Sequence, residues 1–300
     1  MRLKVRSVAP ASVVIALLLA ACSPDNVTSP PNQRRSDLRS SRRTLLPAVT
    51  PQVSAGGLQS CALGSSGTVI CWGDNTYGEV TVPAGLSSVK QVSDGYAHTC
   101  ALKTDGTVVW WGYNATDQTA VPIGLASIVQ VSAGRNHTCA LKSDATVSCW
   151  GYNGNGQAAV PDGLTSVAQV SAGNLHTCAL KTDGTVVCWG DNATGQTAVP
   201  GGLASVTQLS AGESHTCAVK TDATVICWGD DTFGQSTVPA GLTSVAQVSD
   251  GGNHSCALKT DATVVCWGNN NNGESTVPVG LASVAQVSAG NDHTLTLIHI

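Results

Sequence analysis

Residues 170–208 read VSAGNLHTCALKTDGTVVCWGDNATGQTAVPGGLASVTQ, and this 39-residue unit recurs along most of the 300-residue chain. The last copy stops after the sequence VSAGNDHTLTLIHI. Repetition at a fixed period of this size is typical of solenoids and propellers, in which each unit packs against its neighbours. The copies begin at Val53, Val92, Val131, Val170, Leu209, Val248 and Val287.

Each unit predicts three short strands, because apolar residues alternate between breaks rich in Gly, Asp and Asn. In the quoted copy the strands are expected over residues 166–172, 176–181 and 185–190, with a tight hairpin turn at residues 183–184. Three copies carry alanine in place of the turn glycine, so the turn is expected to demand a positive φ less strongly than the glycine suggests. These alanines are Ala145, Ala223 and Ala262.

Both faces of the predicted hairpin are apolar, with Cys178 and Leu180 on one face and Ala179 and Trp189 on the other. Each small sheet must therefore pack between two neighbouring sheets. We predict an all-β propeller over residues 48–300, with seven compact three-stranded blades. The last copy lacks its third strand, which residues 44–52 are expected to supply, and a six-bladed ring is the alternative.

The recurring motif AGxxHTxAL…GTVxxWGxNxxGQ resembles the repeat of the regulator of chromosome condensation superfamily over roughly residues 53–300. The resemblance implies a seven-bladed β-propeller and a binding role rather than a reaction. The short period is closer to the bacterial propeller-type β-lactamase inhibitors, whose blades are compact and three-stranded.

The N-terminus has the pattern of an export signal. A basic start is followed by an apolar stretch over residues 9–21 that is short for a membrane span. It ends in Leu-Ala-Ala-Cys, which resembles a bacterial lipobox, so residues 1–22 are predicted to be a lipoprotein-type signal peptide with Cys22 lipidated. An ordinary cleaved signal is the alternative. Residues 23–47 are rich in Ser, Pro and Arg and are expected to be a disordered tether. We therefore expect an exported protein on the outer membrane or cell surface, held by its lipid.

Ten of the remaining cysteines form pairs that are ten residues apart. The hairpin places Cys178 opposite Cys188 at a distance that suits a disulfide, and export brings the chain to an oxidising compartment. Cys100 faces Trp110 and is expected to be a free, buried thiol. Zinc is the rival reading, but the pairs lie in different blades, so no metal is expected. The predicted disulfides are Cys61–Cys71, Cys139–Cys149, Cys178–Cys188, Cys217–Cys227 and Cys256–Cys266.

One repeat position holds histidine in six copies and Gln59 in the first copy. Equivalent residues are spread around a ring, too far apart to share one metal ion, so the imidazole is expected to bond a backbone group near the Ala-Gly turn. No HExxH, GxSxG or phosphate-loop motif is present, and we expect neither catalysis nor a cofactor. After residue 43 the chain carries 7 basic and 17 acidic residues, which argues against nucleic acid.

The copies differ mainly at the two positions after Ala-Gly and in the loop after Trp-Gly. We predict that a monomer binds a protein or a surface glycan through these loops on one rim, although neutral variation in solvent loops is an equal alternative. Competing functions are inhibition of an extracellular enzyme such as a β-lactamase, and guanine-nucleotide exchange, against which export and acidity argue. A propeller lyase or glycosidase would need clustered acids at the central channel, and the sequence alone does not show such a cluster. The predicted binding residues are Tyr77, Tyr96, Tyr113, Arg135, Tyr152, Glu213 and Phe233.

Overall fold

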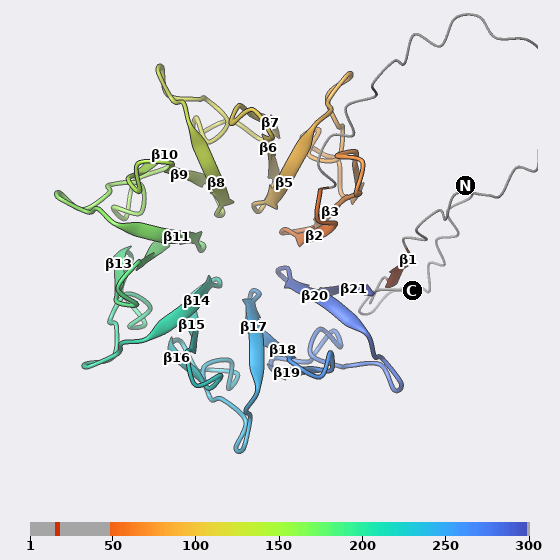
Figure 1. Ribbon diagram of the computed structural model, residues 1–300, viewed down its shortest axis with the longest axis vertical. Helices are drawn as coiled ribbons and strands as arrows, with labels where there is room; N and C mark the ends of the chain where they lie inside the picture. Colours follow the sequence, from red (N-terminus) through yellow and green to blue (C-terminus); the bar gives the residue numbers. More distant parts are fainter. Residues whose placement is uncertain (1–15, 19–48, 299–300) are drawn as a thin grey trace, which may run out of the picture.

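The computed structural model describes residues 16–18 and 49–298, and these residues form strands, turns and loops without a helix. The strands build seven small sheets, arranged like the sectors of a disc around a central axis (Figure 1). The predicted propeller is confirmed, and the ring has seven blades rather than the six of the alternative. In this part of the chain, no helix is long and apolar enough to cross a membrane.

The observed strands begin within a residue or two of the predicted bounds, and blades are numbered 1 to 7 in chain order. The first strands are β2 (Gln52–Ala55), β5 (Val89–Asp94), β8 (Ile128–Ala133), β11 (Val167–Ala172), β14 (Val206–Ala211), β17 (Val245–Asp250) and β20 (Val284–Ala289). The second strands are β3 (Gln59–Leu63), β6 (His98–Lys103), β9 (His137–Lys142), β12 (His176–Lys181), β15 (His215–Lys220), β18 (His254–Lys259) and β21 (Thr294–Ile298). The third strands are β4 (Val69–Gly73), β7 (Val108–Gly112), β10 (Val147–Gly151), β13 (Val186–Gly190), β16 (Val225–Gly229) and β19 (Val264–Gly268).

The loops of each blade are divided between its two ends, because the second strand runs antiparallel to the first and third. In blade 4, Ala172 pairs with Thr177 and Gly190 pairs with His176. One end therefore carries an axial loop, between the first and second strands, and an outer loop, which follows Trp-Gly. We call the axial and outer loops together the loop face. The hairpin end carries the turn between the second and third strands and the start of the first strand.

The hairpin turn requires a left-handed residue even where glycine is absent, so the expectation drawn from the alanine-bearing copies is wrong. Gly184 has φ = 79°, and Ala145, Ala223 and Ala262 have φ values of 63°, 60° and 63°. Left-handed backbone is unfavourable for a residue with a Cβ. The surrounding hairpin, which pairs the strands on both sides of the turn, forces these alanines into it.

The core lies between blades, as the two apolar hairpin faces predicted. Cys178 and Leu180 pack against the next blade, in a buried cluster with Leu209 and Trp228. Ala179, on the opposite face of the same strand, packs in the cluster shared with the preceding blade. Each blade thus buries most of its apolar surface only when both neighbouring blades are in place.

Side chains of the first strands join the blades through hydrogen bonds to backbone. Gln169 Oε1 accepts from Leu209 N (2.9 Å), and Gln169 Nε2 donates to Leu209 O (2.8 Å). Ser171 Oγ accepts from Ala211 N at 3.0 Å. The equivalent glutamine and serine positions make such bonds at all seven junctions, including the one between blade 7 and blade 1. The ring therefore closes without a strand shared between the two ends of the repeat array.

The sequence led us to expect the third strand of blade 7 from residues 44–52, of which the structure describes residues 49–52, and none of these four pairs with β21. Gln52 already begins β2 of blade 1. Instead β1 (Ala16–Leu18) pairs in parallel with β21, with Ala16 opposite Thr296 (Figure 1). This strand lies inside the predicted signal peptide, whose removal would leave blade 7 with two strands. The junction bonds of β20 to blade 1 do not involve β1.

Candidate functional site

The seven axial loops meet at the centre of the ring and bond to one another through backbone groups. Asn174 N donates to Gly212 O (3.2 Å), and the series ends with Asn291 N donating to Gly56 O (3.0 Å). A Cβ on Gly173 would lie 2.5 Å from Gly212 O, so this close approach requires glycine. The glycine of each Ala-Gly or Asp-Gly pair is thus required by the close approach of neighbouring axial loops. The variable residues that follow it surround the opening at the centre of the ring, which we call the mouth.

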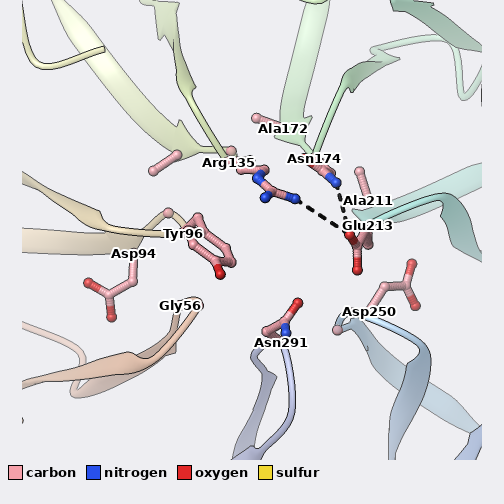
Figure 2. A pocket seen from close by; sticks show the side chains of 18 of the residues that line it. Gly56, Asp94, Tyr96, Arg135, Ala172, Asn174, Ala211, Glu213, Asp250 and Asn291 are labelled. Carbon is pink, nitrogen blue, oxygen red and sulfur yellow. Dashed lines mark hydrogen bonds and ion pairs between the residues drawn. The ribbon is translucent and has the colours of Figure 1, made fainter. Parts of the chain in front are cut away.

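A cavity of about 100 Å³ opens at this mouth, and one half of it is crossed by a chain of side chains. The Arg135 guanidinium lies over the Tyr96 ring, 4.7 Å from its centroid, and is 3.7 Å from Glu213 Oε1. Asn174 Nδ2 donates to the same Glu213 oxygen at 3.0 Å (Figure 2). Loops from blades 2, 3, 4 and 5 therefore build one polar assembly. The other half of the mouth is lined by Gly57, Gly252 and Asn291, together with the carboxyl group of Asp250.

The aromatic residues of the outer loops surround this mouth on the same face. Tyr77 and Tyr113, from neighbouring blades, meet edge to face with ring centroids 4.8 Å apart. Tyr152 and Phe233 are 38% and 46% exposed. The structure thus brings Tyr96, Arg135 and Glu213 together at the axis and spreads the other predicted residues around them. Their role in binding remains a prediction.

The repeated histidines are structural, but the expected backbone partner is wrong. His176 Nε2 lies 2.9 Å from Thr216 Oγ1 of the next blade. Thr216 Oγ1 donates its only hydrogen to Gln196 O, so the histidine must be the donor in its bond with the threonine. Burial lowers the pKa of His176 to about 4, which keeps the ring neutral. Near the Ala-Gly turn the ring packs against Gly173 instead of bonding it.

Two buried acids at the end of the first strand were missed by the sequence reasoning. Asp94 and Asp250 occupy a position at which the other five copies carry alanine. Both are 7% exposed and line the axial cavity. Burial raises the pKa of Asp94 to about 7 and that of Asp250 to about 8. The signal was available, because VSDG replaces VSAG in copies two and six.

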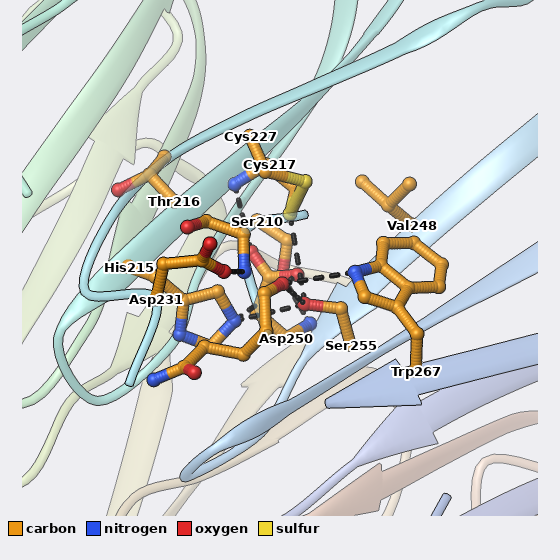
Figure 3. Close-up of a disulfide and its surroundings, with 12 residues drawn as sticks. Ser210, His215, Thr216, Cys217, Cys227, Asp231, Val248, Asp250, Ser255 and Trp267 are labelled. Carbon is orange, nitrogen blue, oxygen red and sulfur yellow. Dashed lines mark hydrogen bonds and ion pairs between the residues drawn. A yellow bond between two sulfur atoms is a disulfide. The ribbon is translucent and has the colours of Figure 1, made fainter. Parts of the chain in front are cut away.

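Asp250 belongs to a cluster that has the composition of a metal site but not its chemistry. His215 Nε2 lies 3.7 Å from Asp250 Oδ1, and Cys217 lies beside both (Figure 3). The Cys217 sulfur is bonded to Cys227, so it offers no thiolate. Its backbone N–H donates to Asp250 Oδ2 at 2.8 Å, and His215 Nε2 is engaged by Ser255 Oγ at 2.9 Å. These contacts make the cluster part of the junction between blades 5 and 6.

All five predicted disulfides are present, and each joins the second and third strands of one blade. Blade 2 has none, and Cys100 is a free, buried thiol opposite Trp110. Burial raises the pKa of the Cys100 thiol well above its usual range. Cys22 and the predicted tether, residues 23–47, lie outside the described residues.

Comparison with known families agrees with the sequence motif. The model of the regulator of chromosome condensation (RCC1) repeat matches residues 52–79, 89–118, 128–157, 167–196, 206–235 and 245–274. The chain belongs to the RCC1 repeat family. Each match begins at the start of a first strand and ends in the outer loop, so the six matches correspond to blades 1 to 6.

Several solved β-propeller structures have a fold similar to that of this chain. The ectodomain of the Arabidopsis thaliana receptor kinase ACR4 is 26% identical, with a TM-score of 0.65 over 80% of this chain and 89% of that one. The Physcomitrella patens CR4 ectodomain is also 26% identical, with a TM-score of 0.67 over 80% and 68%. Prp20p of Saccharomyces cerevisiae is 19% identical, with a TM-score of 0.66 over 80% of each chain, and is similar in fold alone. No curated protein sequence matched.

Proposed function

We propose that this RCC1-repeat propeller is a non-enzymatic protein-binding scaffold of the cell envelope, and that the loop face is its contact surface. One observation carries the proposal: all four tyrosines and the one phenylalanine of the chain lie in the axial and outer loops. Tyr77, Tyr96, Tyr152 and Phe233 are all more than a third exposed there. Exposed tyrosines on a rigid support are favoured anchors of protein interfaces.

The residues that repeat are used by the fold, which supports binding rather than catalysis. The Trp189 indole N–H donates to Gln157 O, and the buried histidines bond the next blade. The cysteines that repeat are consumed in disulfides. Variation between copies is concentrated on the loop face, where it changes the contact surface without touching the junctions between blades.

Anchorage to the envelope rests on the lipobox-like sequence and the disulfides. Disulfides persist in oxidising compartments, and the two plant propellers named above are ectodomains. Cys22→Ser should move the protein from the membrane fraction to the soluble fraction of the native host. Membrane association that survives this substitution would contradict lipid anchorage, although binding by the loop face would be unaffected.

The binding proposal predicts that an envelope partner is captured through the aromatic loops. The bait is residues 23–300, made in an oxidising compartment, and capture from solubilised envelope is measured by quantitative mass spectrometry. Tyr77→Ala, Tyr113→Ala and Tyr152→Ala together should reduce recovery of the partner at least about tenfold, the size expected for loss of interface anchors. The melting temperature should stay near that of the parent, because these rings lie outside the buried junctions.

A control variant keeps the number of substitutions and moves them to the hairpin ends, with Thr104→Ala, Thr182→Ala and Thr260→Ala. This variant should capture the partner as the parent does. Equal recovery with the tyrosine variant would count against the loop face as the contact surface. Capture of a secreted or periplasmic hydrolase whose activity falls in the complex would identify the protein as an enzyme inhibitor instead.

A further inference from the structure

The two ends of the blades differ sharply in charge. The loop face carries seven acids that are at least partly exposed, and one cation, Arg135. The hairpin ends, with the turns that lead into the first strands, carry six aspartates and six lysines. Four of these lysines form ion pairs of 2.9–3.3 Å with the aspartate two residues later. The loop-face acids are Asp74, Asp117, Asp191, Glu213, Asp230, Asp231 and Asp292.

Arg135 does not offset this charge toward a partner. Its guanidinium is 3.7 Å from Glu213 and lies over the Tyr96 ring, so both its charge and one of its faces are already engaged within the mouth. Within the described residues, the remaining loop-face acids have no lysine or arginine beside them on this face. A surface of one sign attracts a partner of the opposite sign and speeds its association.

A second feature of the outer loops points to a polypeptide partner. In blades 4 and 5 the residue after Trp-Gly is an aspartate that accepts a hydrogen bond from a buried glutamine. Gln196 Nε2 donates to Asp191 at 2.7 Å, and Gln235 Nε2 donates to Asp230 at 2.8 Å. These loops therefore satisfy their own buried amides.

In blades 2 and 3 a tyrosine stands at the place of that aspartate. Gln118 and Gln157 are 0% exposed, and among the described residues neither Nε2 has an acceptor. Gln118 Oε1 accepts from the backbone N–H two residues before it, as Gln196 Oε1 does. The Oε1 of Gln118 and of Gln157 is bonded as in Gln196, but the aspartate that accepts from Gln196 Nε2 is replaced by Tyr113 or Tyr152, which leaves each Nε2 without its usual acceptor.

A buried donor without an acceptor is costly, and a partner that supplies one removes that cost. A backbone carbonyl is the acceptor that every polypeptide carries at each residue. Rotation of Tyr113 or Tyr152 away from the loop would admit it. Lysine and arginine side chains of the same segment would meet the acids and lie over the tyrosine rings.

We propose that the loop face binds a cationic polypeptide segment, with its basic side chains on the acids and tyrosines and its backbone carbonyls on Gln118 and Gln157. This inference rests on the proposed function and adds the chemistry of the partner. The site spans the outer loops of blades 2 and 3 and extends across the mouth to the acids of blades 5 and 7, Asp231 and Asp292.

The test measures binding of a fluorescent 16-residue peptide of alternating Lys and Gly to residues 23–300 by anisotropy at 50 mM salt. Asp117→Asn, Asp231→Asn and Asp292→Asn together should weaken binding about tenfold, since three exposed charge pairs are lost. The matched control makes the same change of charge at the hairpin ends, with Asp105→Asn, Asp144→Asn and Asp183→Asn, and should weaken binding less than about twofold. Equal weakening of the two variants would overturn the assignment.

A second variant separates the proposed site from general attraction between opposite charges. Tyr113→Asp with Tyr152→Asp adds two negative charges to the loop face but restores the internal bonds to Gln118 and Gln157. The proposal predicts binding at least about fivefold weaker than that of the parent, whereas attraction by charge alone would make it tighter. Tighter binding would overturn the proposal. If a natural partner is captured through the tyrosines but has no basic segment, the proposed function stands and this inference fails.

Discussion

Reduction of the five disulfides should unfold the propeller at 37 °C. Each bond joins residues ten apart, and closing so small a loop contributes about 2–3 kcal/mol through the unfolded chain. Five such contributions amount to about 10–15 kcal/mol, which is comparable to the whole stability of a typical domain. Circular dichroism should show the melting temperature falling by more than about 20 °C when a strong reductant is added.

Single-blade variants calibrate this expectation. Cys178→Ala with Cys188→Ala should lower the melting temperature by about 5–10 °C without reductant. Cys100→Ala removes a thiol that has no disulfide partner, and the blade that carries it already folds without a bond. It should therefore change the response to reductant little. A fully reduced protein with the melting temperature of the oxidised one would show that the disulfides do not stabilise the blades.

Acidification from pH 7 to pH 5 should destabilise the protein by several kcal/mol. Burial lowers the pKa of His98, His176 and His254 to about 4 and that of His137 and His215 to about 3. The same side chains titrate near 6.5 when unfolded. Between these pKa values the histidines are protonated in the unfolded chain but not in the folded chain. The free energy of unfolding therefore decreases as the pH falls, by about 2 kcal/mol per histidine between pH 7 and pH 5.

The histidine-to-glutamine change measures this directly, because the first copy already carries Gln59, whose Nε2 donates to Gly95 O. In urea titrations, His137→Gln with His176→Gln should reduce the loss between pH 7 and pH 5 by about 4 kcal/mol. If the loss of unfolding free energy between pH 7 and pH 5 is unchanged in this variant, protonation of the histidines does not cause the destabilisation by acid.

The two buried aspartates work in the opposite direction. Their pKa values, about 7 and about 8, lie above the unfolded value, so their contribution is greatest below about pH 4 and is lost as the pH rises through 7 and 8. Asp250→Ala restores the residue of five other copies. It should therefore steepen the acid loss while stabilising the protein above pH 8. The parent should be most stable close to neutrality.

The sequence was sufficient for what lies within one blade. Alternating apolar residues and the hairpin register place Cys178 opposite Cys188, and both facts are local. The packing of Cys178 and Ala179 toward different neighbours follows from the same alternation. Comparison of the copies also located the variable positions that become the mouth, such as Arg135 and Glu213.

Contacts between blades could not be predicted in the same way. The threonine partner of His176 is 40 residues away, and only the rotation between blades brings Thr216 beside it. Likewise, the meeting of Tyr96, Arg135 and Glu213 depends on the curvature of the ring. Within a blade, the left-handed Ala145 was also misjudged, because the pairing of the hairpin strands around it overrode the preference of the residue.

The uniform junctions bear on how such a protein can change over time. Every unit carries the Gln and Ser that join it to the next unit, and six of the seven add a His, which Gln59 replaces in the first unit. The closing junction uses the same glutamine and serine positions as the others. A tandem duplication in register would therefore bring its own connections and leave the closure intact. The number of blades can therefore change by whole units, as far as the curvature of the ring permits. Selection for binding to a partner acts separately, on the few codons of the variable loops.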